Sequence, residues 1–121
     1  MTVSVLICDD SNIARKQLKK ALPDSWQSDV TLVTNGEEAL DALKAGSFDV
    51  LFLDLTMPVL DGFEVLIRMQ SEGIQVKTFV VSADLQAEAK RRVEANGALD
   101  FITKPASATT ILDVLNKHNL L

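Results

Sequence analysis

The stretch Val50-Leu-Phe-Leu-Asp54-Leu-Thr-Met-Pro58 joins four apolar residues to an acidic one at the start of a turn. A short apolar run bounded by turn residues is typical of a β-strand that is covered on both faces. Similar runs occur at residues 3–8 and 78–81, and more mixed runs, typical of strands nearer an edge, occur at residues 30–34 and 99–103. The sequence therefore predicts five strands.

Amphipathic segments with recognisable ends follow these runs. Ser11 is a predicted N-cap for a helix whose apolar positions keep a 3.6-residue period up to Pro23. Asn35 and Glu38 resemble a capping box, and Gly46 is placed to end the second helix in the left-handed conformation. Further helices are predicted at residues 63–73, 84–97 and 107–121. Strict alternation of strands and helices predicts an α/β fold with a right-handed, doubly wound parallel sheet.

Length and composition favour one globular domain over residues 1–121. The chain has 47% hydrophobic and 24% charged residues, and its apolar runs are far shorter than the roughly 20 residues of a membrane span. The net charge of −5 repels a phosphate backbone, so we expect neither membrane insertion nor direct nucleic-acid binding. Cys8 is the only cysteine and no export signal precedes it, which favours a cytoplasmic location.

Polar residues follow the predicted strands at the edge where such sheets bind ligands. Asp9 and Asp10 follow the first strand, Asp54 the third, Ser82 the fourth and Lys104 the fifth. Converging carboxylates raise one another's pKa or hold a cation between them, and oxygen ligands of this kind suit Mg²⁺. The ammonium and the hydroxyl would then complete a cradle for a phosphate group.

Four motifs occur in order along the chain: Cys8-Asp9-Asp10-Ser11, Leu53-Asp54-Leu-Thr-Met57-Pro58 with Asp61-Gly62, Val81-Ser82-Ala83, and Thr103-Lys104-Pro105. Together they resemble the response-regulator receiver domains, in particular the stand-alone chemotaxis-type regulators of bacterial two-component signalling. The resemblance covers essentially the whole chain. It implies a flavodoxin-like sheet with strand order 2-1-3-4-5, five helices and a cis Lys104–Pro105 bond.

The resemblance also implies the chemistry of the site. Asp54 would accept a phosphoryl group from the phosphohistidine of a histidine kinase, with Ser82 and Lys104 assisting. Asp10 would bind Mg²⁺ directly, Asp9 mainly through water, and Thr56 through its backbone carbonyl. Such a protein is a signalling switch that catalyses its own phosphorylation and dephosphorylation, not an enzyme with a separate metabolic substrate.

The same resemblance implies how the signal is passed on. Phe101 stands where the family pairs an aromatic residue with the switch hydroxyl of Ser82, and it lacks the hydroxyl of the tyrosine often found there. A downstream protein would bind the face formed by the fourth helix, fifth strand and fifth helix. Thr56 and Asp84 occupy positions that tune dephosphorylation, although Asp84 is equally suited to cap the fourth helix.

Several residues have simpler structural interpretations. Asp9 and Asp10 would also serve as helix caps, and Cys8 as a small core residue. His118 is expected to complement the dipole of the last helix. Trp26 either packs over the end of the first helix or offers a contact surface, and the sequence leaves both open.

Three other functional classes fit parts of the pattern. A phosphatase of the haloacid dehalogenase-like type would carry a second acid two residues after Asp54, where Thr56 stands. A flavodoxin-like cofactor binder would have a Ser/Thr/Gly-rich loop after the first strand, which is absent from the sequence. A receiver-like scaffold that takes no phosphate is disfavoured because every expected position is filled. Whether an effector domain follows Leu121 in a longer protein stays open.

Overall fold

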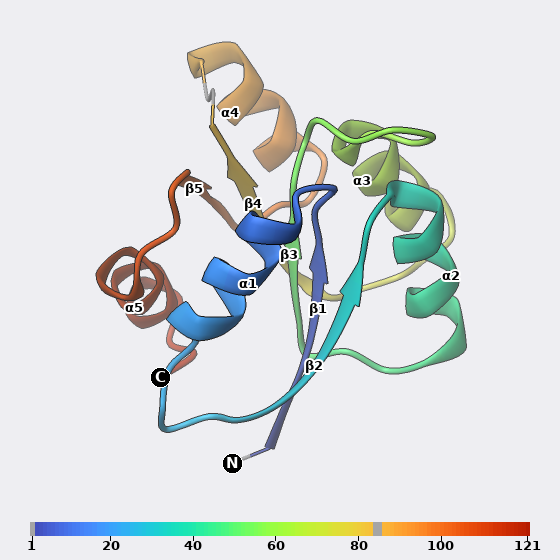
Figure 1. Cartoon of the computed structure of the whole chain (residues 1–121). Coiled ribbons are helices and arrows are strands. Elements are labelled where there is room, and N and C mark those ends of the chain that lie inside the picture. Colours follow the sequence, from blue (N-terminus) through green and yellow to red (C-terminus); the bar gives the residue numbers. More distant parts are fainter. Residues whose placement is uncertain (1, 84–85) are drawn as a thin grey trace.

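Five parallel strands form one sheet in the order β2-β1-β3-β4-β5 (Figure 1). The computed structural model describes residues 2–83 and 86–121. The strands are β1 (Thr2–Cys8), β2 (Gln27–Val33), β3 (Val50–Leu53), β4 (Lys77–Ser82) and β5 (Asp100–Thr103). The predicted strand order is therefore confirmed, and the two mixed runs lie at the two edges of the sheet.

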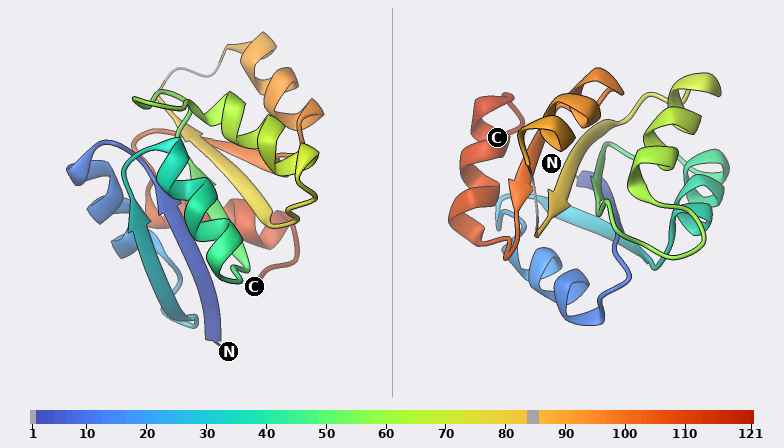
Figure 2. Two further views of the ribbon diagram at one scale, coloured as in Figure 1. Left: turned by 90° about the vertical axis from the view of Figure 1, so that its right-hand side faces the viewer. Right: turned by 90° about the horizontal axis from the view of Figure 1, so that it is seen from above.

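The helices cover both faces of this sheet. They are α1 (Asn12–Ala21), α2 (Gly36–Ala45), α3 (Gly62–Ser71), α4 (Ala87–Ala95) and α5 (Ala108–Lys117). Buried residues of α1 and α5 pack on one face, and those of α2, α3 and α4 pack on the other (Figure 2). No helix in the described part of the chain has the length and apolar character of a membrane span.

The central strand β3 shows why an apolar run forms a strand of this kind. Leu51 and Leu53 pack against α2 and α3, whereas Val50 and Phe52 pack toward α1 and α5. All four side chains are buried because successive strand residues point to opposite faces and both faces carry helices.

Several strand and helix boundaries differ from the predicted ones by one or more residues, and two of them show the physical reason. β2 begins at Gln27, three residues earlier than predicted, because its backbone pairs with β1 from the Thr2–Gln27 register onward although most of its side chains are exposed. α5 ends at Lys117, before the predicted Leu121, and Asn119 follows with a positive φ of 60°. Backbone pairing sets the start of β2, and the turn at Asn119 follows the end of α5. The hydrophobic pattern of the sequence predicts neither.

The prediction for Gly46 is wrong. Its φ is −141°, so the helix does not end there in the left-handed conformation, although its N–H still donates to the Ala42 carbonyl. The chain leaves α2 in an extended direction to reach the start of β3. Left-handed glycines do occur after α3 and α4, at Gly73 (φ 69°) and Gly97 (φ 100°).

His118 does more than complement a helix dipole. Its Nε2 lies 2.9 Å from Asp100 Oδ2, and Lys117 Nζ lies 3.1 Å from the same oxygen. Burial raises the pKa of Asp100, but hydrogen bonds from His118, the Phe101 N–H and Lys117 outweigh it and hold that pKa below its ordinary value. This cluster ties the end of α5 to the start of β5.

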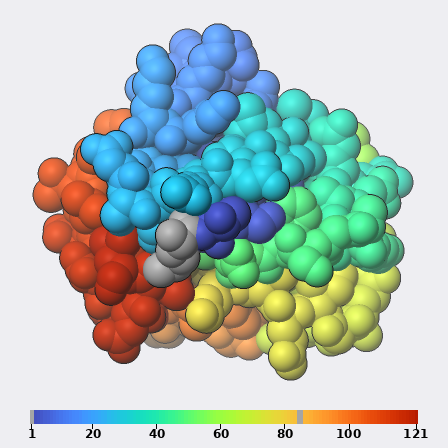
Figure 3. All heavy atoms as spheres, turned by 90° about the horizontal axis from the view of Figure 1, so that it is seen from below, coloured from blue at the N-terminus to red at the C-terminus, as the bar shows by residue number. Residues whose placement is uncertain are grey.

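Trp26 belongs to the core. Its side chain is only 6% exposed and packs with the α1 and α5 layer, so it is not a contact surface. Figure 3 looks onto the amino-terminal edge of the sheet, where the start of β1 is surrounded by segments from the whole chain.

A strained turn connects β3 to α3. Val59 has φ 69°, and the Leu60 N–H donates to the Pro58 carbonyl at 2.7 Å. A β-branched residue in this region is strained, because its Cβ lies too close to backbone atoms. The Val59 side chain is 72% exposed, so no burial compensates for the strain.

We expect Val59→Gly to stabilise the protein by about 1 kcal/mol, because glycine has no Cβ to strain at positive φ and this relief exceeds its added entropy in the unfolded chain. Urea unfolding would measure the change in free energy. Val59→Ala is the matched control, since it removes the apolar side chain but keeps a Cβ at the same φ. Equal stability of all three proteins would show that the turn stores no strain.

Candidate functional site

The site begins where the ladders of β1 and β3 end. The Asp54 N–H donates to the Cys8 carbonyl at 2.9 Å, and the Asp9 N–H donates to the Val33 carbonyl at 3.2 Å. These bonds extend the sheet by one residue beyond each strand. Both acids are therefore held by the backbone of neighbouring strands at the sheet's carboxyl edge, at the top of Figure 1.

Three carboxylates meet at this edge, as the sequence predicts. Asp9, Asp10 and Asp54 each offer an oxygen, and these oxygens lie within 4.8 Å of one another. Asp9 and Asp54 are buried, whereas Asp10 is exposed. An all-oxygen donor set with one side open to solvent fits Mg²⁺, which keeps part of its water shell.

Lys104 supplies the positive charge at the site. Its Nζ lies 2.7 Å from Asp9 Oδ2 and 3.7 Å from Asp54 Oδ1, so it pairs more closely with Asp9. Its backbone N–H donates to the Ser82 carbonyl at 2.9 Å, and the Lys104–Pro105 bond is cis, as expected.

The environment of Asp54 disfavours its charged form. Burial and the nearby Asp9 carboxylate raise the pKa of Asp54 to about 6, although Lys104 and the Thr56 backbone N–H oppose the shift. One ammonium therefore does not neutralise the carboxylates gathered here. A further cation would relieve the remaining repulsion.

A hollow of about 470 Å³ opens over these groups. It is lined by Asp10, Asp54, Leu55, Thr56, Phe63, Ser82, Ala83, Ala89 and Lys104. Thr56 and Ser82 thus lie at the site, as predicted. Phe63 and Ala89 were not predicted, because their place in the wall depends on how α3 and α4 pack and not on a motif.

Phe101 is not among the described residues that line that hollow. Phe101 is half-buried on β5, and Lys90 Nζ lies 4.4 Å from its ring centroid. Asp84 lies outside the described residues. The N-cap of α4 is Gln86, whose side chain makes no capping hydrogen bond.

Neither acid of the first loop caps α1. Ser11 is the N-cap, and its Oγ accepts from the Ala14 N–H at 3.2 Å. Asp9 instead accepts from the Ser11 N–H and pairs with Lys104. Asp9 therefore does not cap α1, and its carboxylate lies together with those of Asp10 and Asp54.

Two supporting residues have roles that their spacing did not reveal. A Cβ at Gly62 would collide with the Asp54 carbonyl oxygen, so only glycine lets α3 start this close to the site. Arg15, on the first turn of α1, is half-buried and donates from Nη1 to the Asp9 carbonyl at 2.6 Å.

Cys8 lies beneath the site as a core residue. Its Sγ is 3.2 Å from the sulfur of Met57, and burial together with the Asp9 and Asp54 carboxylates raises its pKa to about 12. A thiol that stays protonated is a poor nucleophile, which agrees with the structural interpretation.

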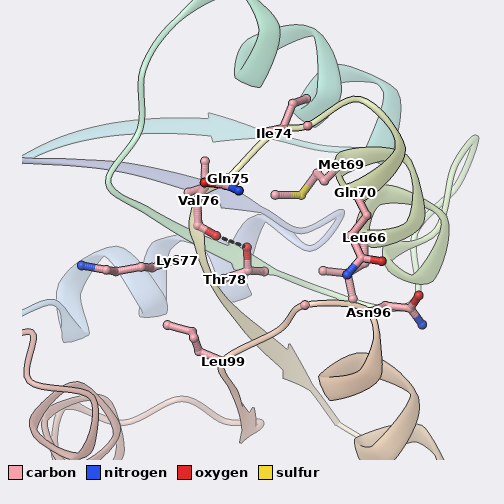
Figure 4. A pocket seen from close by; sticks show the side chains of 12 residues that line it. Leu66, Met69, Gln70, Ile74, Gln75, Val76, Lys77, Thr78, Asn96 and Leu99 are labelled. Atoms are coloured by element: carbon pink, nitrogen blue, oxygen red, sulfur yellow. Dashed lines mark hydrogen bonds between the residues drawn. The ribbon is translucent and has the colours of Figure 1, made fainter.

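A second hollow, of about 650 Å³, lies at the amino-terminal edge between α3, β4 and the α4–β5 connection (Figure 4). Its lining combines apolar side chains such as Met69 and Ile74 with the amides of Gln70, Gln75 and Asn96. Among the described residues that line it there is no carboxylate, in contrast to the opposite edge.

Comparisons with known proteins agree with this arrangement. The model of the response regulator receiver domain family matches residues 5–116. The chain is 33% identical to the chemotaxis protein CheY of Listeria monocytogenes, covering 95% of this chain and 97% of that protein. It is 37% identical to a protein-glutamate methylesterase/protein-glutamine glutaminase of Halalkalibacterium halodurans, covering 98% of this chain but only 35% of that protein.

Solved structures show the same fold. The chemotaxis response regulator CheY4 of Vibrio cholerae superposes with a TM-score of 0.83 at 31% identity, covering 97% of this chain and 98% of that one. The similarity therefore extends over nearly all of both chains.

We expect Asp54→Asn to stabilise the metal-free protein at pH 8 by roughly 2–3 kcal/mol, because it removes a buried charge. A raised pKa in the folded state means that ionised Asp54 opposes folding fully above about pH 6. The penalty vanishes as the pH falls below about 4, where the carboxyl is protonated in both states.

Thermal unfolding in a chelator from pH 4 to 8 would measure this difference. Asp41→Asn, which neutralises an exposed acid on α2, is the control for net charge. A gain that is independent of pH, or equal in the control, would contradict the origin in the Asp54 charge.

Proposed function

Because the chain belongs to the response regulator receiver domain family, we propose that it is a phosphorylation-dependent signalling switch whose phosphoacceptor is Asp54. The phosphoryl donor would be the phosphohistidine of a histidine kinase. The observation that carries the proposal is the meeting of three carboxylates with Lys104 at the carboxyl edge of the sheet. Asp54 is the member that follows a fully buried central strand.

The transfer forms a bond between an Asp54 carboxylate oxygen and phosphorus, and it breaks the bond between phosphorus and the histidine nitrogen. The nitrogen keeps the electron pair of that bond and later gains a proton. A carboxylate is a weak nucleophile, so the step depends on alignment and charge neutralisation more than on a base. Lys104 provides positive charge, and the backbone bond from Asp54 to β1 fixes the nucleophile.

The residues that would hold Mg²⁺ are Asp10 and Asp54 directly, Asp9 through water, and Thr56 through its carbonyl. When bound, the ion supplies charge neutralisation and orients phosphoryl oxygens. Two observations support this assignment: the oxygens of the three carboxylates lie within 4.8 Å of one another, and Asp10 is exposed, so that it is accessible as a ligand.

The proposed output begins at Ser82 and Lys104, which move toward the phosphoryl group and bias a pre-existing equilibrium of β4, α4 and β5. α4 is suited to respond because Val93 is its only buried residue and its N-cap makes no side-chain hydrogen bond. Phe101 would exchange its place beside Lys90 for a more buried one. A downstream protein would then recognise the face of α4, β5 and α5.

Thr56 and Asp84 would set the lifetime of the phosphorylated state, because they would lie beside the path of the attacking water. Thr56 is exposed and lines the hollow over Asp54. The acyl phosphate is a mixed anhydride, so the modification would act as a reversible timer.

Incubation with Mg²⁺ and a small phosphodonor is expected to add one phosphoryl group to the protein, and Asp54→Asn is expected to abolish the addition. Intact-mass analysis measures both. Asp113→Asn, an exposed acid on α5, should still be labelled, and a chelator should prevent labelling of the unchanged protein. Labelling of Asp54→Asn at the original level would refute the assignment, and no labelling under any condition would favour a scaffold that takes no phosphate.

Ser82→Ala is expected to keep phosphorylation but to reduce the NMR shift changes that phosphorylation causes at Phe101 and on α4. The reason is that the hydroxyl is the proposed link between the phosphoryl group and β5. Ser71→Ala, on exposed α3 surface, is the matched control. Shift changes confined to the loops around Asp54 in the unchanged protein would count against the switch.

A further inference from the structure

The short turn between β1 and α1 carries Asp9 and Asp10, two of the three clustered acids. Asp9 still pairs with β2 through its N–H, and α1 begins at Asn12. Asp10 lies between these two anchored points. Its side chain is exposed and forms no hydrogen bond or ion pair with residues in the described ranges. Its position therefore depends on the backbone on either side.

Arg15 holds that backbone. Its Nη1 donates to the Asp9 carbonyl at 2.6 Å, and its Nη2 donates to Asn12 Oδ1 at 3.3 Å. The Arg15 N–H also donates to the Ser11 carbonyl at 3.0 Å. The guanidinium thus bridges the residue before Asp10 and the first residue of α1, and a charged donor makes the stronger kind of hydrogen bond.

The contacts of the Asp9 side chain and of its backbone show what the Arg15 hydrogen bond contributes. Its carboxylate is already held by the Ser11 N–H at 2.9 Å and by Lys104 Nζ at 2.7 Å. Its N–H is held by β2, and its carbonyl is held by Arg15 alone among the residues described. Loss of Arg15 would free the peptide unit that joins Asp9 to Asp10, while the Asp9 side chain would keep its partners.

We propose that Arg15 is a positioning residue for divalent-metal binding, which it supports by fixing the peptide unit that presents Asp10. The inference rests on the proposed Mg²⁺ site at Asp10 and Asp54. On this proposal Arg15 strengthens metal binding, although its positive charge by itself would weaken it. A positive charge near the site repels a cation, whereas an ordered ligand lowers the entropy lost on binding.

Because the two effects change Mg²⁺ affinity in opposite directions, Mg²⁺ binding to the unphosphorylated full chain tests the proposal. Arg15→Ala is expected to weaken binding about tenfold, as is typical when a group that orients a metal ligand is lost. Lys16→Ala is the matched control, since it removes the same charge from the next, exposed residue of the helix. It should bind Mg²⁺ as tightly as the unchanged protein or slightly more tightly.

Two milder variants separate the contacts of the guanidinium. Arg15→Lys retains one donor for the Asp9 carbonyl but not the fork, so its affinity should lie between those of the unchanged protein and Arg15→Ala. Asn12→Ala removes only the second contact and should cause a smaller loss. Both keep the proposal testable if Arg15→Ala fails to fold, which thermal unfolding in a chelator would reveal.

Titration calorimetry gives the decisive comparison. Mg²⁺ affinity in Arg15→Ala or Arg15→Lys that equals or exceeds that of Lys16→Ala would overturn the role of Arg15 and leave the proposed function intact. Absence of saturable Mg²⁺ binding in the unchanged protein would instead overturn the metal site on which both depend.

Discussion

Repulsion among three carboxylates at the end of a parallel sheet is the constraint around which the site is organised. Their oxygens approach within 4.8 Å, and one ammonium, on Lys104, faces two of them. The carboxylates stay together because the backbone holds them there: Asp9 and Asp54 continue the hydrogen-bond ladders of β1 and β3. The energy of the sheet and its two apolar layers thus offsets an unfavourable concentration of charge.

The elements around the site differ in how tightly they are held: the starts of α1 and α3 have close contacts with it, whereas α4 has few. Gly62 lets α3 start directly against the Asp54 backbone, and Asp61 caps that helix by accepting from the Glu64 N–H at 2.9 Å. Arg15 ties the first loop to α1. The proposed phosphoryl transfer, which depends on alignment, would therefore take place beside a backbone that these contacts hold.

On the other side, α4 is held by fewer contacts. Val93 enters the core, while Lys90 and Arg92 lie over the rings of Phe101 and Phe63. Contacts of a cation with an aromatic face contribute only about 1 kcal/mol each at exposed sites, so they hold a helix without fixing it. The proposed change at Ser82 would therefore act on a helix with few fixing contacts, whereas α5 is tied to β5 by the cluster around Asp100.

The fold and the conjunction of Asp9, Asp10, Asp54, Ser82 and Lys104 follow from the sequence alone. Buried parallel strands need apolar runs, their carboxyl ends share one edge, and both patterns are local in the chain. The strand that precedes Asp54 was predicted to the residue, because burial on both faces leaves a sharp boundary.

Only the tertiary structure decided which partners these residues choose. Lys104 pairs more closely with Asp9 than with Asp54, Arg15 turns back to a backbone carbonyl, and His118 reaches Asp100 across 18 positions of the chain. The end of α2 at Gly46 and the early start of β2 were likewise set by the direction of the chain and by pairing with β1. Periodicity and motif spacing describe one segment at a time, whereas these choices depend on the distance and burial created when segments pack together.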